Sequence, residues 1–227
     1  MSKKILIVNY IILVILLCLN LTMFINNTFQ TNTEEIYSKS ISKVVEIRTT
    51  EDGVIYSYAT GFFVNKNGTI LTNKHVVYNN DTGKEYSTIE IRLASSNNWQ
   101  HVEIEKISEN SDLALIKSDE QEVSYFKFER KVKNGESIYT IGNPNGFGLS
   151  YTSGIVSSSV KNVIYNENNI KAIQTSFVIN EGNSGGPVFN KNGKVIGIIS
   201  FRLKDKQGNV IQGISFALPY ETIKTFL

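Results

Sequence analysis

The chain has 227 residues, with 23 Lys and Arg against 21 Asp and Glu, two histidines and one cysteine. This near-balance of charge lacks the basic footprint of a nucleic-acid-binding protein, so we expect no nucleic-acid partner. Two histidines and one cysteine are too few for the usual structural zinc site, and we expect neither a metal nor another cofactor.

The first element is an apolar segment over residues 5–25, which carries no charge and follows Lys3 and Lys4. As a helix it would be about 31 Å long, close to the hydrocarbon core of a bilayer. It is longer than the apolar region of a secretory signal and has no small-residue cleavage site, and Cys18 lacks a lipoprotein context. We therefore expect an uncleaved anchor over residues 1–27; a removed signal is the alternative.

The anchor's orientation follows from its flanking charges. Lys3 and Lys4 precede it, and no positive charge follows until Lys39. The positive-inside rule then places the N-terminus in the cytoplasm and the remaining chain outside it, as a single-pass protein of the cell membrane. Residues 28–40 are expected to form a linker with a short helix over 34–42, and residues 41–227 a domain with a C-terminal helix over 220–227.

The domain is predicted to be all-β, because short segments with a polar–apolar period of two recur along it. Turn signals separate them, for example at Asn67-Gly68, Asn134-Gly135 and Asn192-Gly193. Many short strands with such spacing predict a barrel or sandwich. Two barrels fit, at about 41–120 and about 130–218. Four of the expected strands, all in the first barrel, are residues 44–48, 54–58, 88–93 and 102–107.

The run Gly-Asn-Ser-Gly-Gly-Pro at residues 182–187 places Ser184 between glycines, where its hydroxyl can be exposed. A serine nucleophile needs a nearby base, and the chain offers only His75 and His101. His75 ends an apolar run, where a strand would present its side chain at a site. His101 begins an alternating strand, which favours surface packing.

The carboxylate that would orient the imidazole is expected to be Asp112. It opens the apolar segment 112–117, where a carboxylate without a partner would be costly. Asp81 and Asp52 lie in turn sequences, and the remaining aspartates lie in polar stretches. The resulting order, His before Asp before Ser, excludes an α/β-hydrolase, whose histidine follows its serine. A subtilisin order would need Asp52 and a helix-rich chain, and fails on both.

Taken together, these segments resemble the chymotrypsin-like serine proteases, and within them the bacterial HtrA (DegP-like) branch. Any of the segments alone is a weak signal, but they occur in the family order over roughly residues 40–220. The matching segments are residues 60–64, 70–77, 110–117, 141–144, 152–157, 173–175, 183–187 and 213–219. The resemblance implies two six-stranded antiparallel β-barrels, with His75 and Asp112 from the first barrel and Ser184 from the second.

The resemblance also implies the remaining site residues. The amides of Gly182 and Ser184 would form the oxyanion hole, and the substrate would pair as an added strand along residues 213–217. Val178 stands where a basic-specific relative has a carboxylate, so we expect a preference for small or medium aliphatic residues before the scissile bond. The residues expected at this pocket are Val178, Ile179, Gly213, Ile214, Ser215 and Ala217.

The sequence departs from the family at two points, so two of the family's regulatory properties are not expected here. Asn183 replaces the aspartate that pairs with a freshly cut N-terminus in digestive relatives, so activity without proteolytic maturation is expected. The sequence ends at Leu227, so we expect no regulation through a PDZ domain. Family trimerisation through the segment 27–40 is left open.

Two functions remain. The first is a membrane-anchored serine endopeptidase that cleaves unfolded or extracytoplasmic proteins through an acyl-enzyme. The second is a non-catalytic chaperone or adaptor that binds peptides at the same place. The complete set of three catalytic side chains favours the first.

Overall fold

The computed structural model describes residues 3–29, 33–165 and 168–227. The chain divides into two compact units, one ending at Ile36 and one running from Tyr37 to Leu227. The first unit contains helix α1 (Lys3–Phe29), and helix α2 (Thr33–Ser40) spans the boundary. The stretch Lys3–Met23 is long and apolar enough to cross a membrane. The large apolar side chains of residues 5–23 are exposed.

The first sheet of the second unit has the strand order β7-β6-β1-β2-β3-β9-β8, with every pair antiparallel. Only Val102 separates β7 from β8, and its N–H donates to Ile89 O at 3.0 Å. The two segments therefore act as one strand that closes the sheet between β6 and β9 into a six-stranded barrel. The strands are β1 (Val44–Glu51), β2 (Val54–Phe63), β3 (Thr69–Thr72), β6 (Thr88–Leu93), β7 (Gln100–His101), β8 (Glu103–Ile107) and β9 (Ala114–Lys117).

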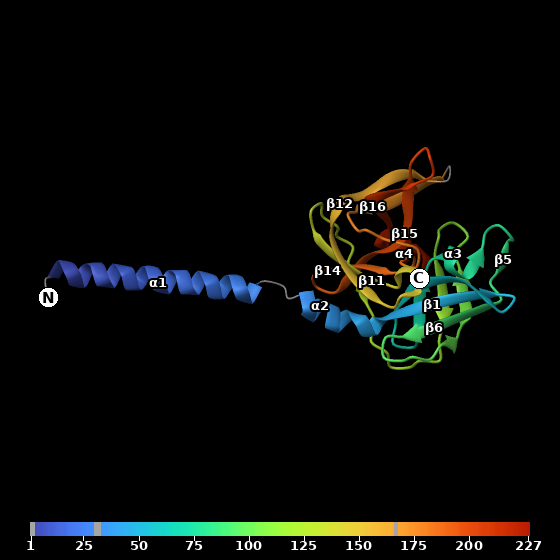
Figure 1. Ribbon diagram of the computed structural model, residues 1–227, viewed down its shortest axis with the longest axis horizontal. Coiled ribbons are helices and arrows are strands. Elements are labelled where there is room, and N and C mark those ends of the chain that lie inside the picture. The colour runs from blue at the N-terminus through green and yellow to red at the C-terminus, as the bar shows by residue number, and fades with distance from the viewer. Residues whose placement is uncertain (1–2, 30–32, 166–167) are drawn as a thin grey trace. The chain divides into compact units, whose positions relative to one another are not determined.

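The second sheet is also closed, because β15 pairs with β14 on one side and with β16 on the other. The ring β15-β14-β11-β12-β13-β16 is antiparallel, and β10 (Lys127–Phe128) adds a short parallel pair to β15. The expected pair of six-stranded barrels is thus confirmed (Figure 1). The ring strands are β11 (Ser137–Gly142), β12 (Ser150–Tyr165), β13 (Asn168–Thr175), β14 (Pro187–Asn190), β15 (Lys194–Lys204) and β16 (Val210–Pro219).

Each barrel has its own apolar core, and a cluster of three aromatic rings joins the two. Phe62 comes from β2 and Phe189 from β14, and Phe126 of the connecting segment lies between them. The ring centroids are 5.7 Å and 5.3 Å apart, and all three side chains are fully buried. Since aromatic rings contribute large buried areas, this cluster fixes one barrel against the other. It thereby sets the relative position of residues on β3 and on the 180–186 loop.

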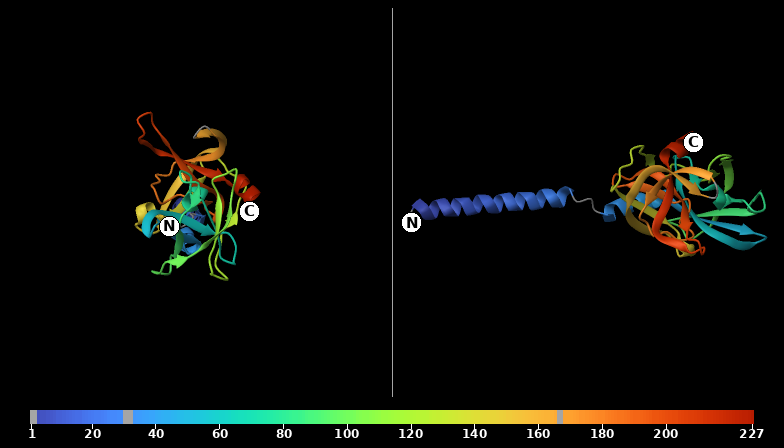
Figure 2. Two further views of the ribbon diagram at one scale, coloured as in Figure 1. Left: turned by 90° about the vertical axis from the view of Figure 1, so that its right-hand side faces the viewer. Right: turned by 90° about the horizontal axis from the view of Figure 1, so that it is seen from above.

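Two long hairpins, β12–β13 and β15–β16, extend beyond the second barrel on the same side (Figures 1 and 2). They share a small core of their own, in which Tyr165 stacks on Phe201 at 4.2 Å and Phe201 on Phe216 at 5.0 Å. This core supports the exposed part of β15, which lies next to the site described below.

Most local expectations agree with the structure. The expected turn at Asp52 is a hairpin turn in which Asp52 (φ 50) and Gly53 (φ 79) both have positive φ, the type I′ pattern. The C-terminal helix is α4 (Tyr220–Phe226), and 3-10 helix η1 (Ile41–Lys43) continues α2. The short elements that were not expected include α3 (Lys74–Val77), the pair β4 (Tyr78–Asn79) with β5 (Lys84–Glu85), and 3-10 helix η2 (Pro144–Gly146).

Candidate active site

His75 lies on the single-turn helix α3, directly after the fully buried strand β3. The sequence suggested a strand end at this position, and the structure differs by one helical turn. Val76 and Val77 of α3 pack into the core of the first barrel, which fixes the direction in which His75 points. Before the helix, the buried Asn73 side chain donates from Nδ2 to Asp112 O at 2.8 Å, so α3 is tied to the segment that precedes β9.

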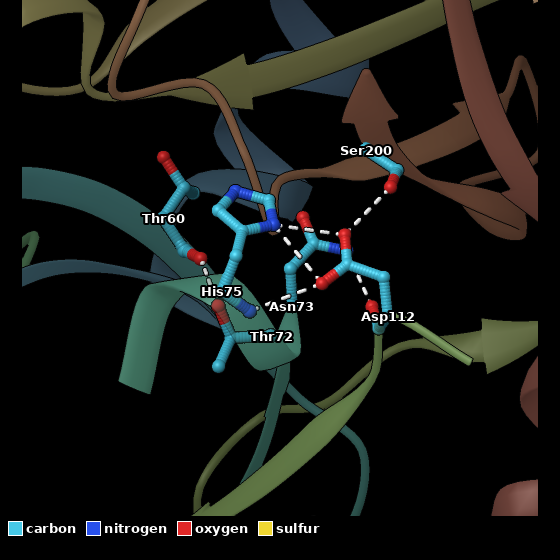
Figure 3. A network of polar contacts seen from close by, with 6 residues as sticks. All are labelled: Thr60, Thr72, Asn73, His75, Asp112 and Ser200. Carbon is cyan, nitrogen blue, oxygen red and sulfur yellow. Dashed lines mark hydrogen bonds and ion pairs between the residues drawn. The ribbon is translucent and has the colours of Figure 1, made fainter. Parts of the chain in front are cut away.

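The His75 imidazole and the Asp112 carboxylate form a close pair (Figure 3). Nδ1 lies 2.8 Å from Asp112 Oδ2 and 3.0 Å from Oδ1, and the backbone N–H of His75 donates to Oδ1 at 3.0 Å. The second ring nitrogen points away from Asp112 (Figure 3). With 38% of the His75 side chain and 30% of the Asp112 side chain exposed, the pair is open enough to meet a substrate.

The pair changes the acidity of the imidazole. Desolvation on burial lowers the pKa of His75, but the charge of Asp112 and its hydrogen bond to the ring raise it, and the pKa is raised overall from its ordinary value. A carboxylate within hydrogen-bond distance favours the charged imidazolium, which explains the direction. The ring is therefore a stronger base than an isolated histidine.

Ser200 is a further polar partner of Asp112, which the sequence did not suggest. Its hydroxyl, on β15 of the second barrel, donates to Asp112 Oδ2 at 2.8 Å (Figure 3). This bond links the carboxylate of the first barrel to a strand of the second. The only signal in the sequence is that a serine ends the apolar run 195–199, which is too common a pattern to identify the residue.

Ser184 lies on the loop between β13 and β14, next to a tight turn. Asn183 N–H donates to Asn180 O at 3.2 Å, and Gly182 has φ 93, a conformation that favours glycine. The Ser184 residue is half-buried. Within the part of the chain that the structure describes, the N–H groups of Gly182 and Ser184 have no acceptor. Two free amides beside one serine are suited to binding a carbonyl oxygen.

Thr60 of β2 attaches this loop to the first barrel. Its hydroxyl donates to Gly182 O at 2.7 Å and accepts from Asn143 N–H at 3.0 Å, while its backbone N–H donates to Ser184 O at 3.0 Å. The Thr72 hydroxyl, three residues before His75, donates to Thr60 O at 2.8 Å. A chain of backbone and hydroxyl contacts thus connects Ser184 to the segment that carries His75.

The candidate site therefore contains residues of both barrels, but the hydrogen bond between Ser184 and His75 is not formed. Across residues 3–29, 33–165 and 168–227, no hydrogen bond joins the Ser184 hydroxyl to the His75 ring. Such contacts are often long in the absence of substrate and tighten in the reacting complex. The loop is nevertheless packed closely on the first barrel, since a Cβ added at Gly185 would collide with Thr60 O and Thr72 Oγ1.

The residues expected at the substrate pocket differ in their exposure. Ile179 and Ala217 pack in the core of the second barrel, and the fully buried Ser215 shares a 2.6 Å hydrogen bond with Thr175. Val178 is 57% exposed, and Gly213 is exposed farther along β16 beside the half-buried Ile214.

The strand expected to accept the substrate is also unsuitable. β16 pairs with β13 on one side and with β15 on the other at residues 215–217, so a peptide cannot add along it there. By contrast, β14 pairs with β15 only as far as Ile198, and among the described residues no strand covers that side of β15 over 200–204. The open edge beside the site therefore belongs to β15.

Among the described side chains, no group of three or more His, Cys, Asp or Glu residues is placed to hold a metal ion. The chemistry available at this site consists of a hydroxyl, an imidazole, a carboxylate and two free amides.

Known proteins share both sequence and fold with this chain. It matches the trypsin-like peptidase domain over residues 59–198. A probable periplasmic serine endoprotease DegP-like protein of Pseudomonas putida (strain W619) is 37% identical over 167 residues, covering 73% of this chain and 33% of the relative. The mitochondrial serine protease HTRA2 of Drosophila erecta is 32% identical over 176 residues, covering 75% of this chain and 39% of the relative. The chain thus spans about a third of the length of these curated relatives.

Two solved structures support the assignment. The HtrA-type protease AlgW with a tripeptide has a TM-score of 0.74 at 28% identity, covering 86% of this chain and 62% of that one. The serine endoprotease from Yersinia pestis has a TM-score of 0.70 at 26% identity, covering 86% of this chain and 64% of that one. This chain belongs to the trypsin-like peptidase family, and the relatives and solved structures that it resembles are serine proteases of the HtrA and DegP type.

Proposed function

We propose that this chain is a membrane-anchored serine endopeptidase in which Ser184 is the nucleophile, His75 the general base and Asp112 the group that orients His75. The observation that carries the proposal is the 2.8 Å contact between His75 Nδ1 and Asp112 Oδ2. This pair belongs to the first barrel, and Thr60 of the same barrel binds the loop that contains Ser184. A hydroxyl with a base, and a base oriented by a carboxylate, is the arrangement that nucleophilic acyl transfer requires.

In the first half of the reaction, Ser184 Oγ attacks the carbonyl carbon of the peptide and its proton passes to His75 Nε2. Asp112 accepts a hydrogen bond from Nδ1–H, which leaves Nε2 free as the base and stabilises the imidazolium. The amides of Gly182 and Ser184 donate to the oxyanion, a contribution of about 3–4 kcal/mol for each such donor. The C–N bond then breaks, and the leaving amine takes the proton from His75.

In the second half, water attacks the ester formed on Ser184. His75 accepts the water's proton and returns a proton to Ser184 Oγ as the acyl product leaves. No cofactor is needed for either half.

The substrate is a polypeptide in extended conformation, paired with the open edge of β15 over residues 200–202. The backbone of such a strand is recognised by main-chain hydrogen bonds that depend little on sequence. A folded domain rarely offers an unpaired extended segment, so unfolded or extracytoplasmic proteins are the substrate class proposed here. By analogy with the family, we also propose that the chain can form a homotrimer through residues 27–40.

The N-terminal helix is proposed as a membrane anchor. Its apolar side chains from Ile5 to Met23 are exposed, for example Leu6 at 61% and Leu17 at 70%, and such a surface is stable only when covered by lipid or protein. Lys3 and Lys4 favour a cytoplasmic N-terminus, with the protease domain outside. The DegP-like relatives named periplasmic agree with this side of the membrane.

A fluorophosphonate probe tests the catalytic proposal on the full chain in detergent micelles. We expect labelling at Ser184 in the untrimmed protein, because Asn183 carries no charge that would require a new N-terminus. Ser184→Ala should abolish labelling and lower turnover by on the order of 10⁶, and Asp112→Asn should lower it by about 10⁴. Peptide binding without labelling would instead identify the non-catalytic chaperone or adaptor.

A further inference from the structure

Arg202 connects the open edge of β15 to the loop that carries the oxyanion amides. Its Nη1 donates to Ile179 O at 3.0 Å, directly before the turn at 180–183. Its Nη2 lies 4.0 Å from Glu181 Oε1. The guanidinium therefore reaches from the strand proposed to pair with substrate to the residue that precedes Gly182.

The donors of this guanidinium are incompletely used. An arginine has five N–H donors, and within the described chain one hydrogen bond is present, besides the long contact with Glu181. Only 22% of the Arg202 side chain is exposed, whereas 87% of the Glu181 side chain is. Because Glu181 is well hydrated, it is a weak partner that a substrate carboxylate can replace at little cost.

The position of Arg202 relative to the reacting atoms determines what it would contact. Ser200, two residues earlier on β15, bonds Asp112, and Gly182 lies one residue after Glu181. A peptide that pairs with residues 200–202 and places its carbonyl oxygen at the Gly182 and Ser184 amides must pass between these two segments. The side chain preceding the scissile bond then lies between β15 and residues 179–181, where the Arg202 side chain crosses from one segment to the other.

The electrostatic environment of Tyr165 is consistent with this position. Burial raises the pKa of the Tyr165 hydroxyl, the charge of Asp112 raises it further, and Arg202 acts in the opposite direction. Tyr165 thus lies within reach of both charges, and it stacks on Phe201 between Ser200 and Arg202.

We propose that Arg202 is a specificity-determining residue that selects an acidic side chain directly before the scissile bond of the substrate. In the complex, the substrate carboxylate takes the place of Glu181 beside the guanidinium. This inference rests on the proposed peptidase function and differs from the aliphatic preference expected from Val178, because Val178 is 57% exposed and Arg202 bonds the carbonyl of the next residue, Ile179.

The test uses the full-length chain in detergent micelles and four peptides that differ only in the residue before the cleaved bond: Glu, Gln, Val or Lys. Mass spectrometry identifies the bond that is cut. We expect kcat/KM for the Glu peptide to exceed that for the Gln peptide about tenfold, the scale of one charge-assisted hydrogen bond, with the Lys peptide poorest. The Glu advantage should shrink as salt is added.

Two variants attribute the effect. Arg202→Gln should bring the Glu-to-Gln ratio close to one, while Arg130→Gln, which removes the same charge from a residue paired with Glu221, should keep it. The rate of fluorophosphonate labelling at Ser184 reports separately on the catalytic groups. A wild-type preference for Val or Lys, or an unchanged ratio in Arg202→Gln, would overturn the role of Arg202. If the fluorophosphonate probe did not label Ser184 of the wild-type chain, the peptidase proposal itself would be overturned instead.

Discussion

Ser200 and His75 bind the same carboxylate oxygen from opposite barrels: the Ser200 hydroxyl donates to Asp112 Oδ2 at 2.8 Å, and His75 Nδ1 lies 2.8 Å from that oxygen. The orientation of Asp112 is therefore set jointly by both halves of the domain. A change in the packing between the barrels would reach the imidazole through this oxygen.

Ser200→Ala should lower kcat about tenfold, the scale of one hydrogen bond to a charged group. Asp112 would no longer share its charge with Ser200, so the pKa of His75 should rise further and the acidic limb of the pH–rate profile should move to higher pH. Ser118→Ala is the matched control, since it removes a buried serine that donates to Gly68 O elsewhere in the first barrel. An unchanged acidic limb in Ser200→Ala would contradict the coupling.

The pH dependence of activity follows from His75. Its pKa is raised by Asp112, and only the neutral imidazole can accept a proton. Activity should therefore rise with pH through an apparent pKa above the unperturbed value of about 6.5. In Asp112→Asn the attraction is gone, so the His75 pKa should fall. Proton NMR of the two histidine signals in a Ser184→Ala background measures both values, and His101→Gln assigns them.

Stability should show the opposite trend over the same pH range. A group with a raised folded-state pKa stabilises the fold fully below its unfolded pKa of about 6.5, and this contribution is lost as the pH rises through the folded value. The Tm advantage of wild type over His75→Gln should therefore shrink with increasing pH. A constant difference across this range would show that the charged form of His75 is not favoured by folding.

Thr60→Val should reduce both stability and turnover. It leaves Gly182 O and Asn143 N–H unpaired in the interior, at about 1–3 kcal/mol for each buried group, and releases the turn at residues 180–183 from the first barrel. Thr49→Val is a suitable control, because Thr49 is also fully buried in the first barrel, where its hydroxyl bonds the Ser57 hydroxyl. Denaturant unfolding and kcat are measured for both. Equal losses of kcat would refute a specific role of Thr60 in holding the turn.

Gly182→Ala should abolish hydrolysis. The positive φ of 93 disfavours any side chain, and the new Cβ would collide with Asn143 O, so the turn and its free amides must move. Gly135→Ala shares the positive φ (77) but has open space around it, so it isolates the backbone strain. We expect Gly135→Ala to lose some stability and keep activity. Normal turnover in Gly182→Ala would exclude its amide from the oxyanion hole.

Much of the fold was predictable, because it depends on local patterns. The strand at residues 88–93 has the bounds expected from its alternation, and the turn at Asp52 follows from its Asp-Gly sequence. Helix α3 was not predictable, since four residues are too few to establish a helical period. Val102 was expected inside one strand and does lie in the continuous segment formed by β7 and β8, where its N–H donates to Ile89 O of β6.

The chemistry of the site was accessible from sequence to different degrees. Ser184 could be proposed from its glycine-flanked run, His75 because the chain has only two histidines, and Asp112 because it opens an apolar segment. Ser200 and Thr60 could not, because a serine or threonine at a strand end has no special signal until its partner across the barrels is known.

The sequence by itself determined the strand-rich domain, the apolar N-terminal segment and the order of the residues proposed to be catalytic, since these depend on composition and on neighbours along the chain. Only the tertiary structure decided which strand edge is open, which expected pocket residues are buried in the core, and that Arg202 meets Ile179. Those features depend on how two closed sheets pack together, which brings together residues far apart in the chain.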